Sequence, residues 1–329
     1  MALRTRLTDR FKIEHPIFSA PMGFIAGGRL AAATSQAGGL GLIGGGYGDA
    51  EWLTREFGEV GNARVGCGFI TWSLARRPEL LDLALARAPA ALMLSFGALA
   101  PFAQTIKRAG VPLICQAQTL AHAREAVAAG ADVIVAQGGE AGGHGGTRAT
   151  LTLTPEIVDY LAGAAPDTLL LAAGGIADGR GLAAALMLGA DGVLIGSRLM
   201  ASAEALTPPG FLDAILAADG DATVKTKVID VVRSYDWPSG ISGRALNTRF
   251  VAEWQGRENA LAEPATRAAE AERYWRAFRA GEAEGTGVFM GEAVGLIHDA
   301  PPAARVIARI VGDAEHLLSN AGGFVAAPI

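Results

Sequence analysis

Short runs of apolar residues alternate with longer stretches of helical period through the first two-thirds of the chain. Apolar runs bounded by glycine or proline are typical of strands buried on both faces, and their alternation with helices is typical of a parallel sheet. The pattern predicts strands at Ile17–Ala20, Leu40–Ile43, Val65–Phe69, Ala91–Leu94, Pro112–Gln116, Asp132–Ala136, Thr168–Ala172 and Asp191–Ile195. It predicts intervening helices that include Arg29–Ala37, Glu79–Ala88, Phe102–Ala109, Ala121–Ala129, Pro155–Ala162 and Gly181–Leu188.

The number of strands indicates how the sheet is arranged. Eight parallel strands with intervening helices close naturally into a (β/α)8 TIM barrel, whereas doubly wound sheets more often stop at about six strands. We therefore predict an α/β protein of the TIM-barrel class.

After Arg198 the pattern changes, because Thr207-Pro208-Pro209-Gly210 interrupts it and a more charged stretch without strong strands follows. We predict a mostly helical cap after strand 8, at 206–285, and a barrel formed by 1–205 and 286–329. An amphipathic helix within 287–321 would close the barrel after its eighth strand. The cap would then lie over the C-terminal mouth, where barrel enzymes place their catalytic residues.

Composition and charge exclude several classes of protein. Half of the 329 residues are apolar and 19% are charged, which supports a large core and excludes intrinsic disorder. The net charge of -5 and the lack of a long basic cluster argue against a nucleic-acid partner. No apolar stretch reaches the roughly 18 residues of a membrane span, so we expect a cytoplasmic protein without a membrane partner. Cys67 and Cys115 lie in separate apolar runs, so we expect both to be small core residues.

A glycine-rich segment, Gln137-Gly-Gly-Glu-Ala-Gly-Gly-His144-Gly-Gly, follows the sixth predicted strand without helical or strand period. Its glycines would let the backbone approach a flat ligand closely, and His144 is its one side chain able to exchange a proton near neutral pH. The alternative is a flexible loop with a solvent-facing histidine. The segment is thus a candidate catalytic loop.

Two other turns suit a phosphate. Ala173-Gly174-Gly175-Ile176 follows the seventh predicted strand and Gly196-Ser197-Arg198 follows the eighth, positions at which many barrels bind phosphate. The alternative is ordinary strand-to-helix turn chemistry. In the cap, six polar and aromatic residues either line a pocket or anchor the cap, and we favour anchoring for most: Arg233, Tyr235, Trp237, Arg244, Asn247 and Trp254.

These motifs, with Ala20-Pro21-Met22-Gly23 and the run from Leu188 to Arg198, resemble nitronate monooxygenases, formerly called 2-nitropropane dioxygenases. The resemblance extends from about Phe11 to the C-terminal helix. It implies an FMN-dependent TIM barrel that needs no metal. In that family a nitronate gives one electron to the flavin, and O2 completes its oxidation to a carbonyl compound and nitrite.

The resemblance also implies roles for individual residues. His144 would face the flavin and the substrate, as a general base or as a hydrogen-bond donor to the nitro oxygens. The FMN-binding residues implied for the ring are Met22, Gly23, Gln116, Gln137 and Gly142, and those for the phosphate are Gly175, Gly196 and Ser197. The partners would be the nitronate and O2, and a homodimer is left open.

The chain departs from the family pattern in two places. Gly66-Cys67-Gly68-Phe69 stands where relatives often carry an asparagine, so Thr71 or a water would have to replace that amide. The segment from Asp236 to Arg244 lacks the tyrosines of many relatives, so the pocket wall could differ.

Two alternative functions remain open. Flavin-dependent enoyl-acyl-carrier-protein reductases and NADH:quinone reductases have the same barrel and a similar loop, and such a reductase would use NAD(P)H. The lack of an evident basic patch argues against an acyl-carrier protein as partner. The non-enzymatic alternative is an FMN-binding carrier or sensor in which His144 is structural.

Overall fold

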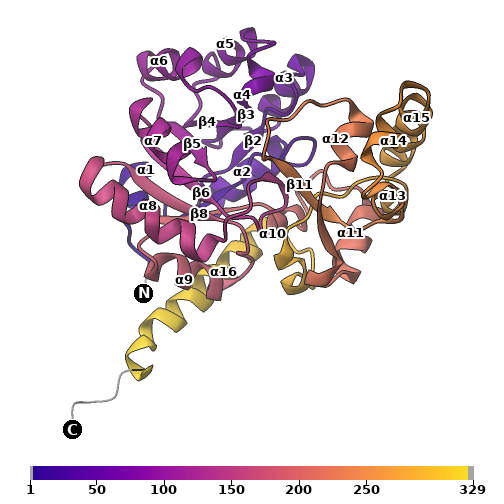
Figure 1. The fold of residues 1–329 in the computed structure, drawn as a ribbon. Coiled ribbons are helices and arrows are strands. Elements are labelled where there is room, and N and C mark those ends of the chain that lie inside the picture. The colour runs from indigo at the N-terminus through magenta and orange to yellow at the C-terminus, as the bar shows by residue number, and fades with distance from the viewer. Residues whose placement is uncertain (1–2, 325–329) are drawn as a thin grey trace.

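The computed structural model describes residues 3–324 and shows a closed barrel with a second group of elements beside it (Figure 1). Eight parallel strands pair in the order β1-β9-β8-β6-β5-β4-β3-β2, and a parallel bridge between Phe18 and Leu40 joins the two ends of this order. The predicted TIM barrel is therefore confirmed. Its strands are β1 (Ile17–Ser19), β2 (Leu42–Gly44), β3 (Gly66–Ile70), β4 (Leu92–Ser95), β5 (Leu113–Ala117), β6 (Val133–Gln137), β8 (Leu169–Ala173) and β9 (Gly192–Ile195).

Side chains of each strand alternate between two apolar layers. In β6, Val133 and Val135 join the cluster shared by the strands inside the barrel, whereas Ile134 and Ala136 pack outward among the helices. Every residue of β6 is buried, which is why the strand is a continuous apolar run in the sequence. The short helix α1 (Arg6–Phe11) adds its buried Leu7 to the inner cluster.

Helices surround the barrel, and three of them begin at a polar side-chain cap. The side chains of Asp49, Thr119 and Asp178 accept hydrogen bonds from the first turns of α3, α7 and α9. The C-terminal α16 lies along α9 and closes the ring of helices (Figure 1). The helices around the barrel are α2 (Gly28–Gln36), α3 (Ala50–Gly58), α4 (Thr71–Leu74), α5 (Glu79–Leu85), α6 (Ala100–Arg108), α7 (Leu120–Ala128), α8 (Thr150–Ala164), α9 (Gly179–Met187), α10 (Ser197–Met200) and α16 (Ala303–Ser319).

Helix α8 begins earlier than the predicted Pro155. The Glu140 carboxylate of the glycine-rich segment accepts hydrogen bonds from both the backbone N–H and the hydroxyl of Thr150. This long-range contact caps the helix five residues before the proline. A sequence pattern that treats proline as a helix start cannot detect a cap supplied by another loop.

The cap is mostly helical, as predicted, but it also contains two strands that the sequence pattern did not indicate. Strands β10 (Thr223–Thr226) and β11 (Ser242–Leu246) are antiparallel, and β11 pairs with a third strand, β7 (Gly143–Gly145). The glycine-rich segment is thus partly a strand, and the expectation that it lacks strand structure was wrong. The cap helices are α11 (Pro209–Ala217), α12 (Val228–Arg233), α13 (Arg249–Trp254), α14 (Glu258–Ala262) and α15 (Pro264–Ala280).

The final predicted helix is shorter than expected. Residues 287–302 form an extended segment and a 3-10 turn, Glu292–Leu296, and only α16 is a regular helix. Pro301 and Pro302 stop a helix from extending backward beyond Ala303, since a proline within it lacks an N–H donor. The segment crosses the barrel mouth, where Gly291 approaches Gly142 closely.

Two simpler features complete the fold. Cys67 and Cys115 are buried and unpaired, as expected of core residues. Among residues 3–324, no helix has both the length and the apolar character needed to cross a membrane.

Candidate active site

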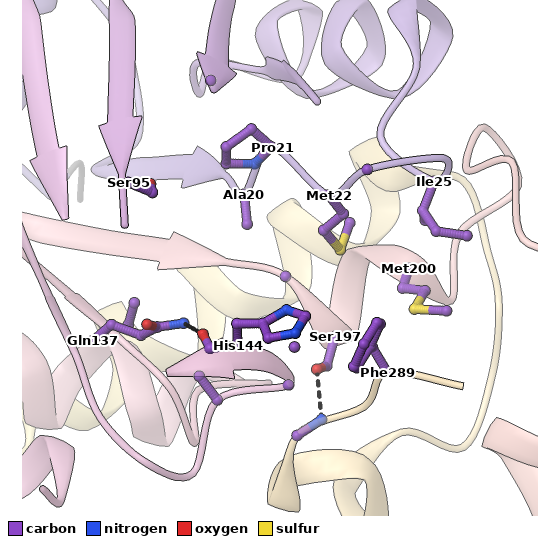
Figure 2. Close-up of a pocket in the computed structure, with 18 of the residues that line it drawn as sticks. Ala20, Pro21, Met22, Ile25, Ser95, Gln137, His144, Ser197, Met200 and Phe289 are labelled. Carbon is purple, nitrogen blue, oxygen red and sulfur yellow. Dashed lines mark hydrogen bonds between the residues drawn. The ribbon is translucent and has the colours of Figure 1, made fainter. Parts of the chain in front are cut away.

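A cavity of about 230 Å³ opens at the C-terminal ends of the barrel strands, between the barrel and the cap. Figure 2 shows His144 in this cavity, with Met22 above it and Ser197 and Phe289 beside it. All nine residues assigned from the sequence line this one cavity: Met22, Gly23, Gln116, Gln137, Gly142, His144, Gly175, Gly196 and Ser197. The structure thus brings the predicted residues together, while their individual roles stay predictions.

His144 is held by its backbone as well as by its ring. It lies in β7, where it pairs with Gly243 of β11. The Gln137 side chain donates to the His144 carbonyl at 3.0 Å (Figure 2), and the Gln118 amide donates to the Gln137 oxygen at 3.1 Å. His144 is only 8% exposed, so the alternative of a solvent-facing histidine in a flexible loop is wrong.

The imidazole has a carboxylate partner from the cap. His144 Nε2 lies 2.8 Å from Oδ1 of Asp230, which is 5% exposed and belongs to α12. A carboxylate can only accept, so Nε2–H is the donor and Nδ1 carries the lone pair. Within residues 3–324 we find no hydrogen-bond partner for Nδ1. A buried carboxylate that fixes the histidine tautomer is the arrangement of a general base.

Burial sets the proton affinity of this histidine. Desolvation lowers the pKa of His144 below its ordinary value, because the charged imidazolium is disfavoured in the cavity wall. The hydrogen bond to Asp230 and its negative charge raise that pKa, while Arg233 and Lys225 lower it again. The net decrease keeps the ring neutral near pH 7, which is the state that a base requires.

Aromatic side chains lie where the cap meets the barrel, and Trp237 of the cap and Tyr47 of the barrel line the cavity there. The Trp237 ring stacks on His144 with centroids 3.5 Å apart and an angle of 6° between the planes. Tyr47 stacks on Tyr235 at 4.0 Å, and burial raises the pKa of both phenols. Both tyrosines therefore stay neutral, and this side of the cavity favours an apolar substrate body.

The cavity wall suits a flat ring that carries a phosphate. At Gly196 an added Cβ would meet no atom closer than 3.5 Å, so it would take up cavity space. At Gly142 it would lie 2.5 Å from the Gly291 nitrogen, so only glycine allows this approach. Ser197 Oγ accepts from the Gly291 N–H at 3.0 Å (Figure 2), which leaves the hydroxyl hydrogen for a ligand oxygen. These features fit a flavin, and the assignment of individual residues to its ring and phosphate stays a prediction.

Two of the six cap residues named from the sequence line the cavity, which agrees with the expectation that most of them anchor the cap. Arg233 and Trp237 line the cavity rather than only anchoring the cap, whereas Trp254 lies in the core of the cap. Asp230 was missed, because nothing in the sequence relates it to a histidine 86 positions away. Thr71, proposed as a substitute for the missing amide, is not among the cavity-lining residues.

Comparison with known proteins identifies the wider group. The family described as nitronate monooxygenase matches residues 4–66 and 76–313. A nitronate monooxygenase of Neurospora crassa is 30% identical over 353 residues, covering 94% of this chain and 92% of that protein.

Two further proteins are similar. The "(3aS,4S,5R,7aS)-5-hydroxy-7a-methyl-1-oxo-octahydro-1H-indene-4-carboxyl-CoA dehydrogenase" of Mycobacterium tuberculosis is 37% identical over 260 residues, 76% of this chain and 68% of that protein. Among solved structures, FabK from Thermotoga maritima superposes with a TM-score of 0.86 at 29% identity, covering 98% of this chain and all of that one.

Proposed function

The chain belongs to the nitronate monooxygenase family of oxidoreductases, whose cofactor is a flavin, and we propose that it uses FMN and O2 to oxidise alkyl nitronates to a carbonyl compound and nitrite. The observation that carries the proposal is the buried pair of His144 and Asp230 in the wall of the cavity. This pair supplies a neutral base for a carbon acid. A nitroalkane and its nitronate are such an acid and its conjugate base.

The protein residues act on the substrate as follows. Asp230 accepts the Nε2–H of His144 and thereby directs the Nδ1 lone pair to the substrate. Nδ1 would take the proton from the carbon of a neutral nitroalkane, and the resulting Nδ1–H would donate a hydrogen bond to the nitronate oxygens. Trp237 stacks on the imidazole and prevents it from rotating, so the base keeps one orientation. The cap and its aromatic side chains exclude water from the reacting carbon.

The residues assigned to the flavin all lie in the barrel part of the chain, 1–205. Met22 and Gly23 would contact the ring, with Gln116, Gln137 and Gly142 at its edge, and Gly175, Gly196 and Ser197 would hold the phosphate. When bound, FMN supplies the redox chemistry by accepting electrons from the substrate and passing them to O2.

A second candidate is a flavin-dependent dehydrogenase that acts on a CoA thioester. The dehydrogenase from M. tuberculosis, at 37% identity, favours it. The proton on the carbon beside a thioester carbonyl is also acidic, so the same base would serve both reactions. The substrate therefore distinguishes the two candidates better than the geometry of the base does.

The test is an anaerobic visible spectrum of the purified protein before and after addition of one candidate reductant. The reductants are an alkyl nitronate, an acyl-CoA and NAD(P)H, each in a separate sample. Bleaching or radical formation by the nitronate alone supports the proposal. Reduction only by the acyl-CoA assigns the second candidate, and reduction only by NAD(P)H assigns a reductase. A protein without flavin that does not take up FMN refutes all three enzymes and the carrier alternative.

A further inference from the structure

Arg233 is a buried cation in the wall of the cavity. It is 9% exposed and is the last residue of α12, three positions after Asp230. Its guanidinium lies 5.0 Å from the centroids of both Tyr274 and Trp275 and 5.5 Å from that of Phe278. These aromatic rings hold the guanidinium group in one place on the cap side of the cavity.

The charge of Arg233 has no carboxylate partner. One guanidinium N–H donates to the Tyr274 hydroxyl at 2.5 Å, and Nε is buried without any hydrogen-bond partner. Asp230, the other charged residue of this face of the helix, hydrogen-bonds to His144 instead. Within residues 3–324, no carboxylate forms an ion pair with Arg233. An unpaired buried charge is destabilising, and cation–π contacts offset only part of that cost.

We propose that Arg233 is a substrate-binding residue that recognises a planar oxyanion, a nitronate or carboxylate group, inside the cavity. A guanidinium presents parallel N–H donors that match two oxygens on one atom. A bound oxyanion would give the orphaned Nε a partner and would neutralise the buried charge. The inference rests on the proposed use of this cavity as the substrate site, but not on the identity of the oxidised compound.

The position of Arg233 relative to the base supports this role. The Phe289 ring lies 5.6 Å from the Arg233 guanidinium and 5.0 Å from the His144 imidazole, so both groups lie beside the same ring in the cavity wall. A substrate lying against this ring would present its acidic carbon to His144 and its oxyanion to Arg233. Such a two-point attachment fixes orientation, which a cavity lined mostly by aromatic rings cannot do alone.

A purely structural role is the competing explanation. In that case Arg233 only connects α12 to α15 through Tyr274, and its substitution would lower stability without changing ligand selectivity. The two explanations therefore differ in one measurable quantity, the preference for an anion over a neutral ligand of the same shape.

The experiment compares isobutyrate with isobutyramide, its neutral isostere, by tryptophan-fluorescence titration of the flavin-loaded protein. We expect the wild type to prefer isobutyrate at least tenfold. Arg233→Gln should lose about 10- to 100-fold in isobutyrate affinity and keep its affinity for the amide. Arg233→Lys keeps the positive charge but lacks the two parallel N–H donors, so it should lose less isobutyrate affinity than Arg233→Gln does. Arg273→Gln, on the exposed side of the cap and paired with Glu253, is the matched control and should bind as the wild type does.

Two outcomes would overturn the proposal: a wild type that does not distinguish the two ligands, or Arg233→Gln binding isobutyrate as tightly as the wild type does. If Arg233→Gln does not fold, equal isobutyrate affinities of Arg233→Lys and the wild type would also refute it. If propane-2-nitronate competes with isobutyrate, the oxyanion at Arg233 is the nitronate group itself. If the two bind at the same time, the oxyanion at Arg233 is a carboxylate elsewhere on the substrate. Arg233-dependent binding without nitronate oxidation would refute the proposed function and leave this inference standing.

Discussion

Replacing Asp230 by asparagine tests whether the buried pair works as a base. The asparagine side chain has nearly the shape of aspartate but no charge, and its amide N–H can donate to His144 Nε2, which would select the wrong tautomer. The bond that is lost is a 2.8 Å contact between two buried groups. A hydrogen bond to a charged partner contributes about 1.5–3 kcal/mol. Because about 1.4 kcal/mol corresponds to a factor of ten in rate, we expect a loss of roughly 10- to 150-fold.

The loss should depend on whether the substrate still carries its proton. A neutral nitroalkane must be deprotonated in the site, whereas a preformed nitronate has already lost that proton. We therefore expect kcat/KM of Asp230→Asn to fall by the full factor for the nitroalkane and much less for the nitronate. His144→Ala should show a larger difference of the same kind while keeping its bound flavin.

The pH dependence of kcat/KM gives a second, independent test of the same pair. Asp230 raises the pKa of His144, so removing its charge lowers that pKa further. The acidic limb of the kcat/KM profile for the nitroalkane should then move to lower pH in Asp230→Asn. Steady-state rates between about pH 5 and 8, the range in which a histidine titrates, would measure this for both substrates. Equal losses for nitroalkane and nitronate, or an acidic limb that moves to higher pH, would refute the assignment of His144 as a base.

Three further predictions address the cofactor, the backbone and the charges. If Ser197 holds the phosphate of FMN, as proposed, Ser197→Asp would set a carboxylate against that phosphate and should lower the flavin content of the purified protein. An unchanged ratio of flavin absorbance to protein absorbance would contradict this phosphate site. Gly142→Ala should lower the free energy of unfolding in urea by about 1–3 kcal/mol, because the added Cβ would lie 2.5 Å from the Gly291 nitrogen. Gly312→Ala is the control: its Cβ would project into open space within α16, so it should raise the free energy of unfolding by about 0.5–1 kcal/mol. Burial lowers the pKa of Lys225 to about 8 in the folded protein, below its value in the unfolded chain. Between pH 8 and about 10 the lysine is therefore more protonated in the unfolded chain than in the folded protein, so the free energy of unfolding should rise with pH over this range. The urea midpoint of wild type relative to Lys225→Met should increase over that range, and a constant difference would show that Lys225 is not desolvated.

The barrel could be predicted from the sequence because each of its strands is a local signal. Strand β6 is buried along its whole length, so its apolar run is visible without knowledge of its neighbours. Strand β7 gives no such signal, since its three residues are Gly143, His144 and Gly145, which have low strand propensity. It is a strand because β11 of the cap pairs with it.

Most of the residues predicted for the site belong to short motifs in the sequence. The glycine-rich segment and the last two barrel turns each place several cavity residues close together in sequence. Asp230 and Arg233 lie in a short cap helix, α12, whose two charged residues are buried among valines and an isoleucine. Their roles depend on distances to His144 and Phe289, which only the folded chain establishes.

The pairing of β7 with β11 has a consequence for protein engineering. His144 belongs to the barrel in sequence, but its strand partner and its carboxylate partner both come from the cap. A chimaera that receives a cap from a relative would therefore inherit a new environment for its base, even if every barrel residue stayed the same. Exchanging the cap and tuning the base are one design problem, so a transplanted cap must bring both a strand that pairs with Gly143–Gly145 and a carboxylate that reaches the imidazole.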